Sequence, residues 1–259
     1  LANRQVSGIK ASEIFLARTA DTPLSALLRN INDRLPTQVI LFEIGSSEDK
    51  LGDSVTEILY RQLLRHFGYA SQDPFIAQLE FELEEEGLLD TFKETFEKEI
   101  GRDWERQREK PGQVKNQISK VMHLLKPNLY PSPDSWSNAN RDGKVLLTSE
   151  NLAQKAVELI NAKCPGQRLF FMIDEVGQYV GKSSEKMFDM EKIVEQFGIH
   201  GQGKVWAAIT AQERLTEVVD NLEGLKVEFA KSQDRFSIKI DLTSENIDEV
   251  IHKRVLSKT

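Results

Sequence analysis

The chain has 259 residues, of which 39% are hydrophobic and 29% are charged, and its formal net charge is −7. This composition is typical of a folded globular protein and excludes a largely disordered chain. The acidic balance also argues against a dedicated nucleic-acid clamp, which needs a basic face, although other parts of a longer protein could still contact DNA.

Three further features of the sequence concern membrane contact, the cellular compartment and whether the chain is a piece of a longer protein. No apolar run approaches the roughly 20 residues that cross a bilayer, and no secretory leader is recognisable, so we expect no membrane contact. A single cysteine, Cys164, excludes an internal disulfide and fits a reducing, cytoplasmic setting. Because the chain begins with Leu1 rather than Met, we expect it to be a piece of a longer protein.

Four segments have the composition of β-strands. The first three are nearly continuous apolar runs, as expected for parallel strands covered on both faces, whereas the fourth alternates like an edge strand. Alternation of such strands with helical patterns predicts an α/β fold with a parallel sheet. The predicted strands are 38–44, 168–173, 204–210 and 236–241. The predicted helices beside them are 53–67, 149–162, 184–197, 213–222 and 244–256.

About a hundred residues between the first two strands contain no convincing strand. Asp73-Pro74 is predicted to open a helix, and the Pro-, Ser- and Asn-rich stretch 128–143 is predicted to be a loop. The mixed charges of 98–120 are interpreted as a solvated helical surface. We therefore expect one partial domain, 1–259, that carries a helical insertion at about 48–148.

An acidic pair, Asp174 and Glu175, directly follows the apolar strand 168–173. Ligands of open α/β sheets bind beyond the carboxyl ends of the strands, so these carboxylates stand where a site is expected. Asp174 would hold Mg²⁺, because a hard cation prefers oxygen ligands, and Glu175 would polarise the water that attacks a γ-phosphate. The alternative is an ordinary strand end whose acidic residues begin a loop or cap a helix.

Polar residues also follow the next predicted strand, in Thr210-Ala211-Gln212-Glu213. In ATPases of the AAA+ type, a polar residue at this place (sensor 1) contacts the γ-phosphate or the attacking water. Thr210 is the first candidate and Gln212 the second, with helix capping as the alternative for Thr210. An Arg just before the last strand of AAA+ proteins often reaches a neighbouring subunit's nucleotide, which makes Arg235 a candidate for that role, and guanidinium suits it because it matches phosphate geometry. A surface ion pair with Asp234 or Glu228 is the alternative.

A phosphate loop is the part of such a site that the sequence lacks. The segment Gly177-Gln-Tyr-Val-Gly181-Lys182-Ser183 has three residues between its first glycine and the Gly-Lys pair, where a Walker A loop has four. No other segment fits that spacing. The letters of a nuclease motif at Glu48-Asp49-Lys50 fall in a polar loop, and one cysteine with scattered histidines gives no zinc spacing.

The motif Asp174-Glu175-Val176-Gly177-Gln178-Tyr179-Val180 is more particular than a bare strand end. With it, the chain resembles the large P-loop ATPase of BREX phage-defence systems (the BrxC/PglY family). The resemblance covers nearly the whole chain. The other segments that resemble the family are 1–8, 40–42, 101–104, 205–206, 210–213 and 234–236.

This resemblance implies a P-loop NTPase with an AAA+-like αβα core that uses ATP and Mg²⁺. It also implies a homo-oligomer that works with other BREX defence proteins in phage exclusion, and a Walker A loop just upstream of Leu1. The chain departs from the family pattern because that loop, the lid domain and sensor 2 are absent from it, so we expect the piece alone to be inactive. Two other classes remain open: a nucleotide-dependent scaffold or switch with little hydrolysis, and an α/β interaction module without nucleotide.

Overall fold

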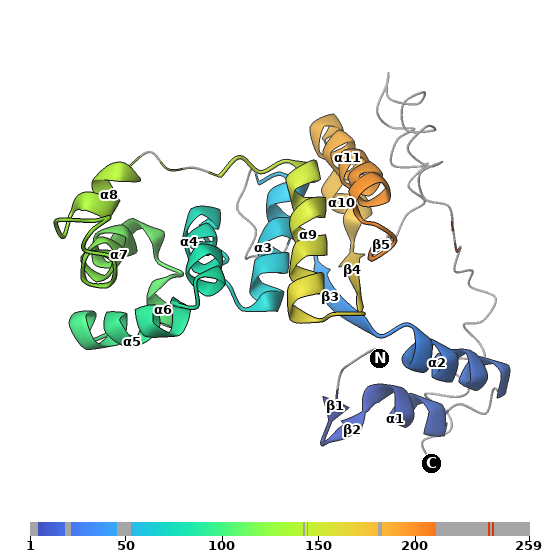
Figure 1. Cartoon of the computed structure of the whole chain (residues 1–259). Coiled ribbons are helices and arrows are strands. Elements are labelled where there is room, and N and C mark those ends of the chain that lie inside the picture. Colours follow the sequence, from blue (N-terminus) through green and yellow to red (C-terminus); the bar gives the residue numbers. More distant parts are fainter. Residues whose placement is uncertain are drawn as a thin grey trace, which may run out of the picture.

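A parallel sheet of three strands, in the order β3-β4-β5, organises the protein (Figure 1). The computed structural model describes residues 5–18, 22–45, 53–141, 143, 145–180, 183–210, 238 and 240. The strands are β3 (Thr37–Glu43), β4 (Arg168–Asp174) and β5 (Val205–Ile209). The α/β class and the parallel pairing of the first three predicted strands are therefore confirmed, with ends displaced by about one residue.

The fourth predicted strand, 236–241, falls almost entirely outside the described residues. Only Ile238 and Ile240 are described, and both lie outside regular secondary structure with exposed side chains. The predicted helices 213–222 and 244–256 also lie outside the described part of the chain. These three elements stay predictions.

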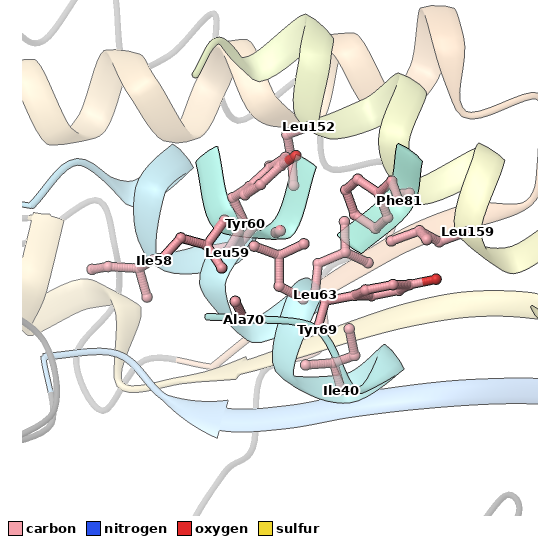
Figure 2. Packing of buried hydrophobic residues seen from close by; sticks show 14 of the residues in the cluster. Ile40, Ile58, Leu59, Tyr60, Leu63, Tyr69, Ala70, Phe81, Leu152 and Leu159 are labelled. Carbon is pink, nitrogen blue, oxygen red and sulfur yellow. The ribbon is translucent and has the colours of Figure 1, made fainter. Parts of the chain in front are cut away.

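One face of the sheet is covered by helices α3 (Val55–Phe67), α9 (Ser149–Lys163) and α11 (Ser184–His200). Because strand side chains alternate between faces, every second residue of the strands points into this layer, including Ile40 and Phe171, which are buried. Figure 2 shows Ile40 in one cluster with side chains of α3 and α9. Burying each such side chain contributes about 1.5–3 kcal/mol, which fixes the sheet against this layer.

The opposite face of the sheet carries the alternate side chains of each strand, and the described helices do not cover it. Its apolar side chains are exposed at Val39, Leu41, Met172 and Trp206. We call these residues, together with Phe170 and Ala208 on the same side of the sheet, the uncovered face.

Further helices between α3 and α9 form a block that Figure 1 shows on the side of α3 away from the sheet. They are α4 (Pro74–Glu85), α5 (Leu89–Ile100), α6 (Trp104–Gln107), α7 (Pro111–Leu125) and α8 (Ser135–Ala139). Asp73 caps α4 by accepting a hydrogen bond from the Phe75 backbone N–H, as its place before a proline predicts. The predicted loop 128–143 is interrupted by α8, because burial of Trp136 against Phe75 orders it.

The charged side chains of the mixed-charge stretch 98–120 are mostly exposed on a helical surface, as the sequence predicted, and Arg108 is the buried exception among them. Trp104 is buried, and Arg108 is only 9% exposed with its Nη1 2.9 Å from Oε1 of Glu80. Glu80 is fully buried and also accepts hydrogen bonds from Trp104 Nε1 and the Ala70 backbone N–H. Burial raises the pKa of Glu80, and Arg108 partly offsets that rise. Besides the nearby Glu105 and Glu109, Arg108 thus pairs with a glutamate of another helix, which the pattern of charges along 98–120 does not reveal.

The amino-terminal elements lie beyond the amino end of β3 in Figure 1. They are an antiparallel pair, β1 (Gln5–Val6) and β2 (Ile9–Lys10), followed by α1 (Ala11–Arg18) and α2 (Thr22–Arg34). Only Leu35 and Pro36 separate α2 from β3. None of the described helices has the length and apolar character needed to cross a membrane.

Candidate functional site

The predicted site residues that the structure describes meet at the carboxyl edge of the sheet. Asp174 ends β4, Glu175 follows it, and Thr210 follows β5. Their common position was predicted from the parallel strands and is confirmed. Gln212 and Arg235 lie outside the described residues, so their predicted roles stay predictions.

Hydrogen bonds connect these three residues directly. The Thr210 hydroxyl donates to Oδ1 of Asp174. The Glu175 backbone N–H points at the same two groups, with its nitrogen 3.1 Å from Asp174 Oδ1 and 3.3 Å from Thr210 Oγ1. The Val176 N–H donates to the Thr210 carbonyl at 3.0 Å. The turn that leaves β4 is therefore attached to the end of β5.

The backbone of Glu175 adopts a left-handed conformation, with φ of 59°. A residue with a side chain at such a φ costs on the order of 1–3 kcal/mol and persists only where its surroundings impose it. Here the bonds from its N–H and the start of α10 (Val176–Val180) at the next residue impose it. The strained residue is the one that sequence reasoning assigned to the attacking water.

A further carboxylate stands beside the pair. Register pairs Glu43, the last residue of β3, with Asp174, and both are exposed. Alternation places them on the same side as the uncovered face, where the Thr210 hydroxyl reaches Asp174. Glu43 is not among the site residues predicted from the sequence, although its position at the end of an apolar run is the same signal that singled out Asp174. We call Glu43, Asp174 and Thr210 the polar row.

The polar row offers hard oxygen donors, which is the donor type that Mg²⁺ requires. Among the described residues, no three or more His, Cys, Asp or Glu side chains gather into a group that could hold a metal ion. Mg²⁺ commonly binds through one or two carboxylates together with waters and substrate phosphates. The residues present therefore fit Mg²⁺ that is shared with a phosphate ligand.

Tyr179, from the most particular sequence motif, contacts residues on both sides of the connection that follows β3. Its hydroxyl donates to the Asp53 carbonyl at 2.9 Å, and its ring lies against Gly45 so closely that a Cβ on the glycine would come within 2.9 Å of Cδ2. Lys186 Nζ lies 3.6 Å from the ring centroid. Tyr179 thus joins α10 to both sides of the 46–52 connection that leaves β3.

The rejected phosphate-loop segment is partly described. Gly177 lies inside helix α10, and Ser183 caps α11 by accepting a hydrogen bond from the Lys186 N–H at 3.3 Å. Gly181 and Lys182 lie outside the described residues. No protein-family model matches the chain, and the search of solved structures found no match. A fold does not by itself determine a function, which depends on the chemistry of the site.

Proposed function

We propose that this chain is the Mg²⁺- and water-handling part of an ATP-hydrolysing, AAA+-like P-loop domain. The observation that carries the proposal is the hydrogen-bonded group of Asp174, Thr210 and the strained Glu175 at the carboxyl edge of a parallel sheet. Open α/β sheets bind ligands at this edge. Strained backbone concentrates at functional sites, which favours a role for Glu175 beyond ending a strand.

Each residue has a separate task in this proposal. Asp174 holds Mg²⁺ through its carboxylate, and when bound the ion neutralises charge on the phosphate oxygens. Glu175 accepts a hydrogen bond from the attacking water and orients it. Thr210 fixes the Asp174 carboxylate and the Glu175 backbone with one hydroxyl, so it couples the positions of metal ligand and base.

The phosphate contacts come from a loop outside this chain, because no segment of the sequence has Walker A spacing. This chain alone then binds ATP weakly or not at all. The resemblance to the BREX ATPase supplies the wider proposal: a homo-oligomer in the cytoplasm that acts with other defence proteins against phage. Arg235 would act across the subunit boundary of that oligomer.

The proposal is preferred over a scaffold that binds nucleotide without hydrolysing it. Such a scaffold could use Asp174 and Thr210 equally well, but it has no need to hold Glu175 in a costly conformation. An interaction module without nucleotide likewise needs no exposed carboxylate oriented by two neighbouring donors.

The decisive experiment is ATP turnover by the full-length protein with Glu175→Gln. Glutamine keeps the shape of the side chain but removes its basicity, so ATP still binds while turnover falls by roughly 10²-fold or more. Glu195→Gln, an exposed position on α11, is the matched control and keeps normal turnover. Unchanged turnover in Glu175→Gln, with a correctly folded protein, contradicts hydrolysis at this site.

A further inference from the structure

The uncovered face has the character of a buried surface. Val39 is 36% exposed, Leu41 65%, Met172 39% and Trp206 51%. They lie side by side, because register pairs Val39 with Phe170 and Phe170 with Trp206, and pairs Leu41 with Met172. Parallel sheets are normally covered on both faces, and the continuous apolar composition of these strands fits that arrangement.

Helix α2 presents a matching surface. Leu27 is 59% exposed and Ile31 46% exposed, and the two residues lie four positions apart in α2. Residues four apart lie on one side of a helix, so these side chains form one apolar stripe. The helix has polar residues on its other sides, among them Arg29, Asn30 and Asp33.

The connection between α2 and the sheet allows the two surfaces to meet. Two residues, Leu35 and Pro36, join α2 to β3, and helix-to-strand connections of two to six residues are common. The 13 residues of α2 span about 20 Å, which matches the roughly 23 Å length of β3. Since α3, α9 and α11 fill the other face, a helix that folds back along β3 has only the uncovered face available.

Charge adds a second argument. A helix that folds back along β3 runs antiparallel to it, so the amino end of α2 arrives near the polar row with Glu43 and Asp174. The first turn of α2 contains no acidic residue, and the partial positive charge of a helix amino end favours nearby carboxylates. Apolar stripe and charge therefore favour the same placement.

We propose that α2 docks on the uncovered face, with Leu27 and Ile31 packed against Leu41, Met172 and Trp206. The docked helix covers the second face of the sheet and forms a wall beside the polar row. The position of α2 in Figure 1, beyond the amino end of β3, is then an open arrangement of the same chain.

Two other candidates for covering the uncovered face can be distinguished from α2: the predicted helix 213–222 and a second copy of the chain. The predicted helix 213–222 carries Leu215, Val218 and Leu222 on one side, but it follows β5. Chain that continues past β5 to a further parallel strand makes a right-handed crossover, which keeps its helix on the face that already holds α11. A second copy of the chain is the other occupant, and its binding depends on protein concentration.

Fluorescence of Trp206 tests the proposal in the 259-residue chain. Trp104 and Trp136 are buried, so Trp206 is the tryptophan that changes between an open and a covered face. We expect Trp206 to be shielded from acrylamide in the parent protein, with the Trp206→Phe variant giving the background of the two buried rings. The double variant Leu27→Asp, Ile31→Asp should raise the Trp206 quenching constant about threefold or more, because carboxylates cannot be buried on an apolar face.

Leu129→Asp is the matched control, because Leu129 is exposed in the helical block, away from both surfaces, and its change leaves quenching as in the parent. A second measurement is disulfide formation in the triple variant Leu27→Cys, Leu41→Cys, Cys164→Ser. Docking brings positions 27 and 41 together, so it predicts that this disulfide forms. The proposal is overturned if acrylamide quenches Trp206 of the parent protein as readily as an exposed tryptophan and no disulfide forms. Shielding of Trp206 that is lost on dilution overturns the proposal in favour of a second copy of the chain. Shielding that is lost in the double variant Val218→Asp, Leu222→Asp but kept in the α2 variant overturns it in favour of the predicted helix 213–222.

Discussion

The hydroxyl of Thr210 donates a hydrogen bond to the carboxylate of Asp174 across neighbouring strands, although 36 positions separate the two residues in the sequence. The same oxygen accepts the Glu175 backbone N–H at 3.3 Å. One side chain therefore orients both members of the acidic pair. Variants of Thr210 can therefore test what the hydroxyl contributes while both carboxylates stay in the protein.

Removing that hydroxyl should slow hydrolysis more than it weakens nucleotide binding. In the full-length protein, we expect Thr210→Val to lower kcat by roughly 10–100-fold, because Asp174 and Glu175 lose their common partner, and Thr210→Ser to keep most of the activity. Steady-state turnover and equilibrium ATP binding, measured side by side, check this. Thr95→Val in α5, which also loses a hydroxyl hydrogen bond, is the control. Equal kcat in the Thr210 valine and serine variants would contradict the role of the hydroxyl.

The left-handed backbone at Glu175 makes a prediction about stability. Glu175→Gly and Glu175→Ala both remove the carboxylate, but only glycine relieves the steric cost of φ at 59°. We expect the glycine variant to be more stable than the alanine variant by about 1 kcal/mol in urea unfolding.

The same pair of changes at Glu195, inside helix α11, should give the opposite sign, with glycine about 0.5–1 kcal/mol less stable than alanine. If Glu175→Ala is as stable as Glu175→Gly, the strained conformation is not present in solution.

The two carboxylates of the polar row should differ in their effect on Mg²⁺. Asp174→Asn replaces a charged oxygen ligand with a neutral amide, so we expect the Mg²⁺ concentration for half-maximal turnover to rise about 10-fold or more in the full-length protein. Glu43→Gln should raise it less, because register places Glu43 beside Asp174 rather than next to Thr210.

Titration of turnover with Mg²⁺ at saturating ATP measures both effects. Asp90→Asn, in the first turn of α5, is the control for lost surface charge. A normal Mg²⁺ dependence in Asp174→Asn would remove this residue from the metal site.

The buried pair of Glu80 and Arg108 should dominate the stability of the helical block. Arg108→Met leaves the Glu80 carboxylate buried without its cation, which should cost about 3–5 kcal/mol in urea unfolding at pH 7.5. Lys93→Met removes a solvent-accessible pair with Glu105 and should cost only about 0–1 kcal/mol.

The pH dependence gives the second test of this pair. Burial raises the pKa of Glu80 in the folded protein, and loss of Arg108 raises it further. The folded variant then takes up a proton at a pH where the unfolded chain does not, so its stability deficit should shrink as the pH falls from 7.5 towards 5. A deficit that stays constant or grows over this range would mean that Glu80 is not held as an unpaired carboxylate.

The sequence alone determined the elements that local pattern controls. Apolar runs predicted three parallel strands, and Asp73-Pro74 marked a helix start, because hydrophobic period and capping chemistry depend on neighbours in the chain. A parallel sheet brings the carboxyl ends of its strands to one edge, so the meeting of Asp174 with Thr210 also followed from sequence reasoning.

The tertiary structure decided which residues from distant segments meet. The neighbour of Asp174 at the edge, Glu43, depends on strand order and register, and the burial of Arg108 depends on a glutamate supplied by another helix. The left-handed φ of Glu175 arises from hydrogen bonds to the end of β5. Strand order, burial and backbone strain are set by long-range packing, and a pattern read along one stretch of chain does not contain that information.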